Sequence, residues 1–190
     1  ILFDVLDWLD YDNYKNQMVC RFVTNGIFFN NRIYKKFLNR VPTSSIKFSI
    51  DAATEETYVK IRRQNKYKTI INNLVNYGKY RDKKNHFLEV NNNINMLNVY
   101  ECEKMIEDVA DANLDIMGLS LTVPLQDEYT PTICISKDNY KIFEDNFNKA
   151  RIRADELGVN LQSINSIFYQ VDIGGDFLID QNIKDGNDLW

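Results

Sequence analysis

Short strand-like segments alternate with helix-like segments along this chain, and the alternation constrains the fold more than any single residue does. In the strand-like segments apolar residues alternate with polar ones or run together, and in the others they recur every three or four positions. Strands separated by helices predict βαβ units and a parallel sheet. The predicted strands are 18–23, 46–50, 87–94, 116–123 and 159–164, and helical spacing covers 33–41, 70–77, 102–114 and 140–157.

Residues that begin and end secondary structure support these boundaries. Asn25-Gly26 is a turn signal directly after the first strand. Thr54 can cap the N-terminus of a helix whose first residues, Glu55 and Glu56, suit the positive end of the helix dipole. Gly158 can adopt the left-handed conformation that ends many helices.

Composition limits the classes of protein to which the chain can belong. With 190 residues, 44% of them hydrophobic, we expect one domain over 1–165 and an irregular tail over 166–190, with a short strand at 177–179. A net charge of −4 disfavours nucleic acid as a partner. No apolar stretch approaches the about 20 residues that span a bilayer, and no signal peptide is evident, so we expect no membrane partner and a cytoplasmic location. The chain begins with Ile1 rather than Met, and we expect it to be part of a longer protein.

Cysteine and histidine are too sparse to predict a metal site. Cys20, Cys102 and Cys134 are widely separated, which argues against a disulfide framework and predicts core thiols in a reducing compartment. The single histidine, His86, has no second ligand at metal-binding spacing, and we expect it at the surface.

Two charged groups are interpreted as solvated surface. The acidic pair Asp127 and Glu128 falls in a predicted loop, where solvation is a better explanation than acid–base catalysis. The run of Arg81, Lys83 and Lys84 follows a predicted helix, and cations favour helix C-termini, so a solvated helix end is preferred to a binding patch.

Polar residues occupy every second position of three predicted strands, which is unusual for parallel strands covered on both faces. Because side chains alternate between faces, each strand has one apolar and one polar face. If helices cover the apolar faces, the polar faces line an open or partial barrel whose cavity holds a polar ligand. An antiparallel sheet with one wet face is the alternative. The polar positions are Lys47, Ser49 and Asp51; Glu89, Asn91, Asn93 and Asn95; and Ser120 and Thr122.

Ser49, Asp51 and Arg62 are the residues most suited to ligand binding. Ser49 and Asp51 lie at the carboxyl end of their strand, where α/β sheets and barrels place ligands. A serine hydroxyl can donate to a ligand carboxylate, and an arginine on the following helix can bind the same carboxylate through two N–H groups. From these residues alone, a strand-end turn and a surface arginine are the alternative.

The order of several motifs resembles the radical S-adenosylmethionine (radical SAM) superfamily. Residues 49–62, SIDAATEETYVKIR, resemble the S-I-D-G-A-T-x-E-T-Y-x-K-I-R segment of its SPASM-type branch, which often carries a cysteine-rich C-terminal extension. Thr24-Asn25-Gly26 matches the family's TNG strand end, and residues 67–74 resemble its f-x-x-v-x-x-N-l helix. Asn98 and Glu101 match an N-x-x-E that follows the next strand. The resemblance covers about residues 18 to 123 and extends to about 165.

The resemblance implies a fold, cofactors and site residues. The fold is a parallel-sheet partial (β/α) TIM-like barrel, here truncated at its N-terminal side. The family uses S-adenosylmethionine and a 4Fe–4S cluster to generate a 5′-deoxyadenosyl radical, which abstracts hydrogen from a small-molecule or peptide substrate. By resemblance, Ser49 and Arg62 bind the methionyl carboxylate or ribose side. The implied cofactor-binding residues are Asn25, Ser49, Asp51, Arg62, Asn93 and Asn95, and the implied substrate-cavity residues are Glu89, Ser120 and Thr122.

The chain departs from the family in the cluster region. No Cys-x-x-x-Cys-x-x-Cys occurs, the SPASM cysteines are absent, and Ala52 replaces the usual glycine. We therefore expect the C-terminal part of a core barrel, catalytic when a segment outside this chain supplies the cluster. The alternatives are a degenerate barrel that binds a peptide or partner, and an unrelated α/β domain. A truncated barrel exposes apolar surface, so we also expect self-association.

Overall fold

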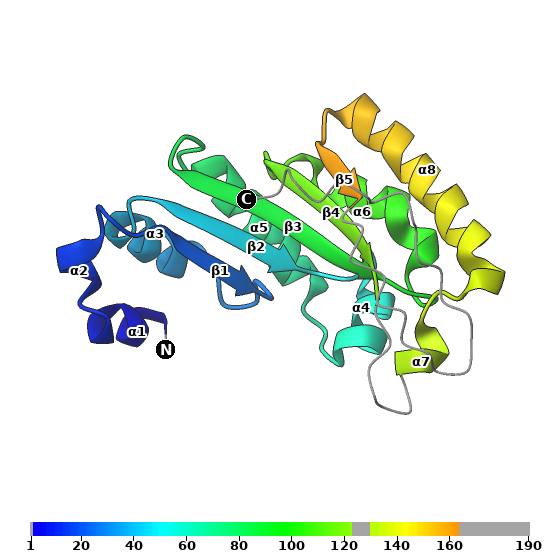
Figure 1. Cartoon of the computed structure of the whole chain (residues 1–190), viewed down its shortest axis with the longest axis horizontal. Helices are drawn as coiled ribbons and strands as arrows, with labels where there is room; N and C mark the ends of the chain where they lie inside the picture. Colours follow the sequence, from blue (N-terminus) through cyan, green and yellow to red (C-terminus); the bar gives the residue numbers. More distant parts are fainter. Residues whose placement is uncertain (1, 123–129, 164–190) are drawn as a thin grey trace, which may run out of the picture.

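The computed structural model describes residues 2–122 and 130–163 of the chain. In these residues five strands form one sheet in the order β1-β2-β3-β4-β5, and all neighbouring pairs are parallel (Figure 1). The predicted parallel sheet is confirmed, and the antiparallel alternative is wrong. Over the described residues the sheet is open, with β1 and β5 as its edges. The strands are β1 Cys20–Thr24, β2 Ser44–Ser49, β3 His86–Ile94, β4 Ile116–Leu121 and β5 Leu161–Ser163.

Helices connect the neighbouring strands, as the alternation predicts. They are α1 Leu2–Trp8, α2 Tyr11–Tyr14, α3 Asn31–Arg40, α4 Glu55–Arg62, α5 Tyr67–Tyr80, α6 Cys102–Ala110, α7 Thr130–Ile133 and α8 Tyr140–Leu157, with short 3-10 helices at Val99–Glu101 and Lys137–Asn139. The sequence pattern does not predict α1 and α2, which precede the sheet. Within the described ranges, no helix combines the length and apolar character needed to cross a membrane.

The long helices form one layer against one face of the sheet. α3 contacts α5, α5 contacts α6, and α6 contacts α8. A sheet built in sequential order with right-handed crossovers places its connecting helices on the same side. On that side Phe48 and Val90 are fully buried, whereas on the other face Lys47 and Asn91 are half-buried and Asn93 is exposed. The predicted division into an apolar and a polar face is therefore confirmed.

Both predicted helix caps are present. Thr54 Oγ1 accepts a hydrogen bond from the Thr57 N–H at 3.2 Å, which satisfies a backbone donor in the first turn of α4. Gly158 ends α8 in the left-handed conformation, with φ of 67°. Short-range sequence signals thus determine where these two helices begin and end.

Two predictions at the amino edge of the sheet are wrong. His86, expected at the surface, is buried, and its Nδ1 lies 2.8 Å from Ser44 Oγ. Burial lowers the pKa of the His86 imidazole, because the charged form loses its hydration. Arg81, expected to be solvated, is also buried, whereas Lys83 and Lys84 of the same run are exposed as predicted.

The cysteines largely follow the prediction of core thiols. Cys102 and Cys134 are buried, and Cys20 is only half-buried in the edge strand β1. Burial raises the pKa of the Cys102 thiol to about 12, so this side chain is protonated at neutral pH. The acidic pair Asp127–Glu128 and the tail over 166–190 lie outside the described residues.

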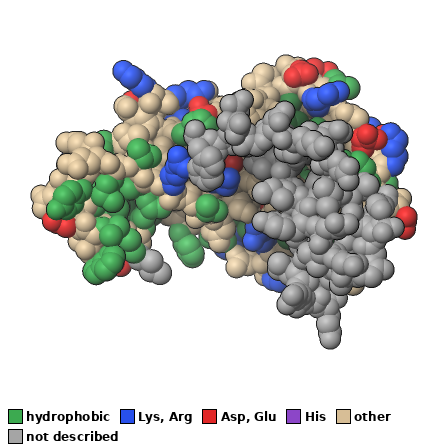
Figure 2. Space-filling view, viewed as in Figure 1, with side chains coloured by type: hydrophobic (Ala, Val, Ile, Leu, Met, Phe, Trp, Pro, Cys, Tyr) green, Lys and Arg blue, Asp and Glu red, His purple; other side chains and the backbone are tan. Residues whose placement is uncertain are grey.

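Large apolar side chains are exposed near the first edge of the sheet. They gather at the end of the molecule that carries α1, α2 and β1 (Figure 2). Val23 on β1 is 74% exposed, and Phe28 in the following loop is 79% exposed. Exposed apolar patches are common at interaction surfaces, so these side chains are compatible with the self-association expected of a truncated barrel, which stays a prediction. Further exposed apolar side chains of the segment 2–28 are Val5, Trp8, Leu9, Tyr14, Met18 and Val19.

Candidate functional site

β2 ends in a turn that few residue types adopt. Asp51, just past the strand, has a φ of 65°, in the left-handed region. Among residues with a Cβ atom, Asp and Asn adopt this conformation most readily, because their short polar side chains can bond locally. The Asp51 N–H donates to Asn92 Oδ1 on β3 at 2.6 Å. The end of β2 is thereby joined to β3 at the carboxyl edge of the sheet.

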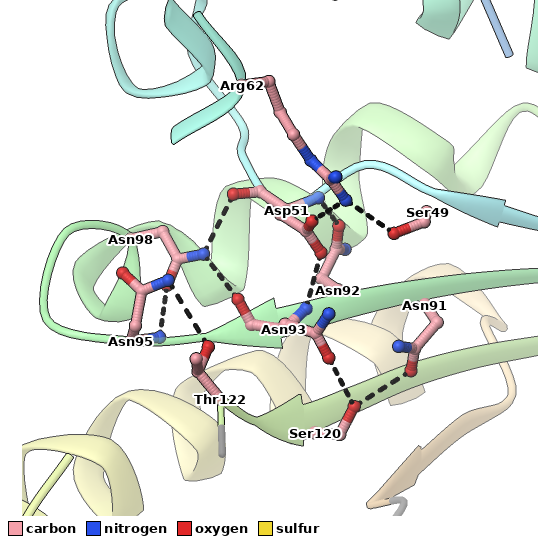
Figure 3. Close-up of polar contacts among 10 residues, drawn as sticks. All are labelled: Ser49, Asp51, Arg62, Asn91, Asn92, Asn93, Asn95, Asn98, Ser120 and Thr122. Carbon is pink, nitrogen blue, oxygen red and sulfur yellow. Dashed lines mark hydrogen bonds and ion pairs between the residues drawn. The ribbon is translucent and has the colours of Figure 1, made fainter. Parts of the chain in front are cut away.

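The Asp51 carboxylate lies at the centre of the site (Figure 3). Its Oδ1 accepts the Asn93 N–H at 2.7 Å, and its Oδ2 pairs closely with Arg62 Nη2. The side chain is only 5% exposed. Burial raises the pKa of Asp51 above its ordinary value, and the Asn93 N–H and the Arg62 charge oppose this shift. Asp51 is thus held within the protein and orients the groups around it.

Arg62 brings the last turn of α4 to the end of β2. Its Nη2 donates to Ser49 Oγ at 2.8 Å as well as to Asp51. Both bonds use the same nitrogen, and the Arg62 side chain is 36% exposed, so further guanidinium N–H groups remain to meet a ligand. The Ser49 hydroxyl accepts from Arg62, and its own hydrogen can donate either to the Asp51 carboxylate, where it opposes the rise in pKa, or to a ligand. The pair can therefore bind an external carboxylate or another anionic oxygen.

Polar side chains of β3 and β4 continue the site on the open face. Ser120 Oγ lies 3.2 Å from Asn91 Oδ1 and 3.4 Å from Asn93 Oδ1, and its one hydrogen can donate to either. Asn93 is exposed, so its amide can also contact a ligand. Strand register places Ser49 beside Asn91 and Asn93 beside Ser120, which makes one polar strip across three strands.

Asn95 and Thr122 lie next to this strip but use their polar groups internally. Asn95 is buried, and its Oδ1 accepts the Leu97 N–H at 2.9 Å. Its Nδ2 lies 3.5 Å from Thr122 Oγ1, at the limit of a hydrogen bond. The sequence groups Asn95 with the cofactor-binding residues and Thr122 with the cavity; in the structure the two connect the ends of β3 and β4.

Asn25 shares no hydrogen bond with the other site residues in the described part of the chain. It is exposed, and its Oδ1 accepts the Ile27 N–H at 3.2 Å. Gly26 follows with φ of 76°, and a Cβ there would lie 2.6 Å from the Phe48 ring. Asn73 on α5 holds this turn by donating to Gly26 O at 2.9 Å. The TNG segment therefore has a structural explanation of its own.

Glu89 lies on the open face, away from the carboxyl edge. Its carboxylate pairs with Lys47 at 2.7 Å on the neighbouring strand. Glu89 is 14% and Lys47 36% exposed. Glu89, predicted to line the cavity, thus forms an ion pair with Lys47. The pair places two charged groups on the polar face and adds no net charge.

Sequence reasoning assigned no role to three residues that assemble the site. Asn92 accepts from the Asp51 backbone, and Asn98 donates to the carbonyls of Asp51 and Asn93, both at 2.9 Å. Glu101 accepts from Thr54 Oγ1 at 2.7 Å. The N-x-x-E pattern contained the signal for two of them, but spacing alone does not say which backbone groups a side chain meets.

The described residues do not fit an iron–sulfur cluster. Residues 2–122 and 130–163 contain no group of three or more His, Cys, Asp or Glu side chains that could hold a metal ion. They do fit the carboxylate end of an amino-acid-like cofactor, because the Ser49 hydroxyl and the Arg62 guanidinium converge there. Arg62 Nε is buried and has no hydrogen-bond partner among these residues, as expected where a guanidinium is incompletely paired.

The fold and the site define a parallel α/β protein with a polar, anion-compatible site at the carboxyl edge of its sheet. No protein-family model matches this chain, and no curated protein matches its sequence. The features that bear on function are therefore the site itself and the motifs that resemble the radical SAM superfamily.

Proposed function

We propose that this chain is the S-adenosylmethionine-binding part of a radical SAM enzyme whose cluster-binding segment lies outside it. The observation that carries the proposal is the Ser49–Arg62 pair, joined at 2.8 Å beside the buried carboxylate of Asp51. This pair stands at the carboxyl end of β2, where parallel α/β folds bind ligands. It is also where the motif resemblance places the methionyl carboxylate.

The proposed roles follow from the hydrogen-bonding capacity of each group. Arg62 and Ser49 donate to the methionyl carboxylate, and Asp51 keeps the guanidinium in place without contacting the cofactor. The exposed amide of Asn93 is suited to the ribose hydroxyls, with Ser120 orienting it from β4. Glu89 and Lys47 lie further from this edge, toward the proposed substrate side of a partial barrel.

The bound cofactors supply the hydrogen-abstraction chemistry, and the protein supplies binding and orientation. In this proposal the cluster ligands come from a segment outside the chain, and the substrate is a small molecule or a peptide. The residues described above then act by holding the cofactor at the open polar face. The barrel itself is part of the proposal. In the described ranges the sheet has five parallel strands and open edges.

A second candidate function is a non-catalytic module that binds a peptide. It is favoured by β1, which pairs with β2 on one side and has no second neighbouring strand among the described residues. Exposed sheet edges bind extended peptides by adding a strand. Exposed Val23 on this strand would contact such a peptide.

Calorimetric titration with two ligands tests the first proposal. We expect the full chain to bind S-adenosylmethionine more tightly than its decarboxylated analogue, because only the former presents a carboxylate to Arg62. The Arg62→Met variant should lose about 10- to 100-fold in affinity for S-adenosylmethionine, the effect of one charged hydrogen-bonding group. Its affinity for the decarboxylated analogue should change little.

The neighbouring Arg63 provides the matched control. It is exposed and caps α4 with φ of 58°, so Arg63→Met alters the same helix end and the same net charge. Equal losses in both variants would reduce the effect to general electrostatics and overturn the assignment of Arg62. Absence of any S-adenosylmethionine binding by the folded chain would favour the peptide-binding module.

A further inference from the structure

We infer that the loop after β3, residues 95–101, is a latch that sets the position of Arg62, with Glu101 and Asn98 as its positioning residues. Neither side chain contacts Arg62, and neither needs to touch a ligand. The proposal that this latch tunes ligand affinity rests on the proposed function. The positioning itself is a property of the protein and can be measured without a ligand.

Glu101 fixes the beginning of α4. Its carboxylate accepts the Ala53 N–H at 2.7 Å, Thr54 Oγ1 at 2.7 Å and Thr57 Oγ1 at 2.6 Å. These donors surround the N-cap Thr54, whose own Oγ1 caps the helix by accepting the Thr57 N–H. Glu101 therefore adds to the local cap and holds it in place from a segment distant in the sequence. A carboxylate is also favoured there by the positive end of the helix dipole.

The position of the helix start determines the position of Arg62. α4 has eight residues, and Arg62 is its last. At 1.5 Å per residue, the guanidinium-bearing end lies about 12 Å from the Thr54 cap along a rigid rod. A rotation or shift at the cap is therefore carried to Arg62, which must still reach Ser49 Oγ.

Asn98 fixes the other partner of Arg62. It is fully buried, and its Nδ2 donates to Asp51 O and to Asn93 O, each at 2.9 Å. Its Oδ1 accepts the Asn95 N–H at 2.8 Å, so both ends of the amide are used. The bond to Asp51 O holds this residue in its left-handed conformation, with φ of 65°.

The same loop therefore controls both sides of one contact. Glu101 holds the helix that carries Arg62. Asn98 holds the turn that carries the Asp51 carboxylate (Figure 3). Loss of either anchor leaves the other in place, so Arg62 should lose its orientation while the sheet remains folded. This is the expected behaviour of supporting residues around a binding group.

Nuclear magnetic resonance of the arginine side chains tests the positioning directly. In the wild-type chain we expect a resolved Nε–H signal for Arg62 with slow solvent exchange, because this atom is buried; Arg62→Lys assigns the signal. In Glu101→Ala, the Arg62 Nε–H chemical shift should move to the value of solvent-exposed arginines. Its hydrogen exchange with water should become at least about tenfold faster. Glu101→Gln keeps one acceptor oxygen and should give a smaller change. Asn98→Asp keeps the oxygen for Asn95 but removes the N–H donors, and should resemble Glu101→Ala.

Glu103, an exposed glutamate on α6, supplies the control. Glu103→Ala should leave the Arg62 signal unchanged. An unchanged Arg62 signal in a folded Glu101→Ala chain would overturn the latch, whatever the chain binds. If folding fails in that variant, the Glu101→Gln and Asn98→Asp signals decide the question in the same way.

Ligand titration then separates the latch from the proposed function. If the wild-type chain binds S-adenosylmethionine, Glu101→Ala should weaken that binding about tenfold, as loss of outer-shell partners does at metal sites. The variant should also show a smaller preference for S-adenosylmethionine over its decarboxylated analogue. If the wild-type chain binds neither, the proposed function fails while the Arg62 signal still reports on the latch. If Glu101→Ala binds S-adenosylmethionine with wild-type affinity and wild-type preference over the analogue, residues 95–101 do not influence ligand binding.

Discussion

Two Arg–Asp pairs lie at opposite ends of the strands, one at the carboxyl edge and one at the amino edge of the sheet. In one pair the aspartate is the less exposed residue, and in the other the arginine is. At the carboxyl edge, Asp51 is 5% exposed and its partner Arg62 is 36% exposed. At the amino edge, Arg81 is 0% exposed and its partner Asp115 is 20% exposed, with the charged atoms 2.8 Å apart. The carboxylate is therefore the buried member of one pair, and the cation is the buried member of the other.

The reversed exposure corresponds to different partners. Arg81 donates to Asn113 O at 2.7 Å and, in a close contact, to His86 O, while Asp115 accepts the Leu88 N–H at 2.7 Å. This pair forms hydrogen bonds with backbone groups at and just before the beginnings of β3 and β4. In α/β barrels the amino face contributes stability and the carboxyl face carries function. Under the proposed function, the two pairs would divide in the same way. An arginine becomes available to a ligand when its carboxylate partner, rather than the arginine, is buried.

Removing each arginine should give the largest difference between the edges. Arg81→Met leaves Asp115 and two carbonyl groups without their donor, and loss of one member of a buried pair costs about 3–5 kcal/mol of unfolding free energy. Arg62→Met should cost less, about 1–3 kcal/mol, because Asp51 keeps the Asn93 N–H and its raised pKa favours uptake of a proton when the guanidinium is lost. Urea denaturation of both variants measures the difference. Equal costs of the two variants would contradict this difference in the energetics of the two pairs.

Close packing beside the Arg81 pair should give the next largest effect. A Cβ atom at Gly78 on α5 would lie 1.7 Å from Ala112 O, a backbone atom that cannot move aside alone. Gly78→Ala should therefore destabilise the protein by about 3 kcal/mol. Gly158→Ala is the control. No atom of the described residues lies within 4 Å of its Cβ position, so only the strain of φ 67° remains, about 1 kcal/mol. A Gly78→Ala cost no larger than that of Gly158→Ala would show that α5 does not pack tightly there.

The pH dependence of stability should have opposite signs at the two edges. Burial lowers the pKa of His86, so the unfolded chain binds its proton more readily, and stability falls as pH drops below the ordinary value of about 6.5. Burial raises the pKa of Asp51, so its contribution is complete below the unfolded value of about 3.9 and falls as pH rises through the folded value.

Denaturation at a series of pH values checks both slopes. His86→Asn keeps an oxygen near the position of Nδ1 and should flatten the loss of stability below pH about 6.5. Asp51→Asn keeps the left-handed conformation accessible and should remove the slope that begins above pH about 3.9. Wild-type slopes that persist in both variants would assign the pH dependence to other groups.

The secondary structure followed from local patterns, with errors at strand ends. Strand β2 begins at Ser44 rather than 46, and β4 ends at Leu121 rather than 123, since pairing with neighbours, not local pattern, sets these ends. The sequence pattern did not predict the helices α1 and α2. The alternation of Lys47 and Ser49 with Phe48 predicted which side chains face the helices, because period two is a property of any strand.

The candidate site was predicted in part. The structure joins Ser49, Asp51 and Arg62 as the sequence suggested, by hydrogen bonds that cross the turn after β2. It does not join Asn25 to them within the described residues, and it engages Asn95 in its own turn. An asparagine in a sequence shows only that an amide is present; the backbone groups around it decide whether it faces a ligand.

The sequence by itself determined the parallel order of strands and helices, the apolar and polar faces of the sheet, and the two caps at Thr54 and Gly158. These depend on local periodicity and on the conformational preferences of single residues. Only the tertiary structure decided that Arg81 and His86 are buried, that Asp51 is the buried member of its pair, and that Glu101 anchors α4. Several of these contacts join segments distant in the sequence, such as Glu101 and Thr54, which are 47 residues apart, and no local pattern encodes which of them meet.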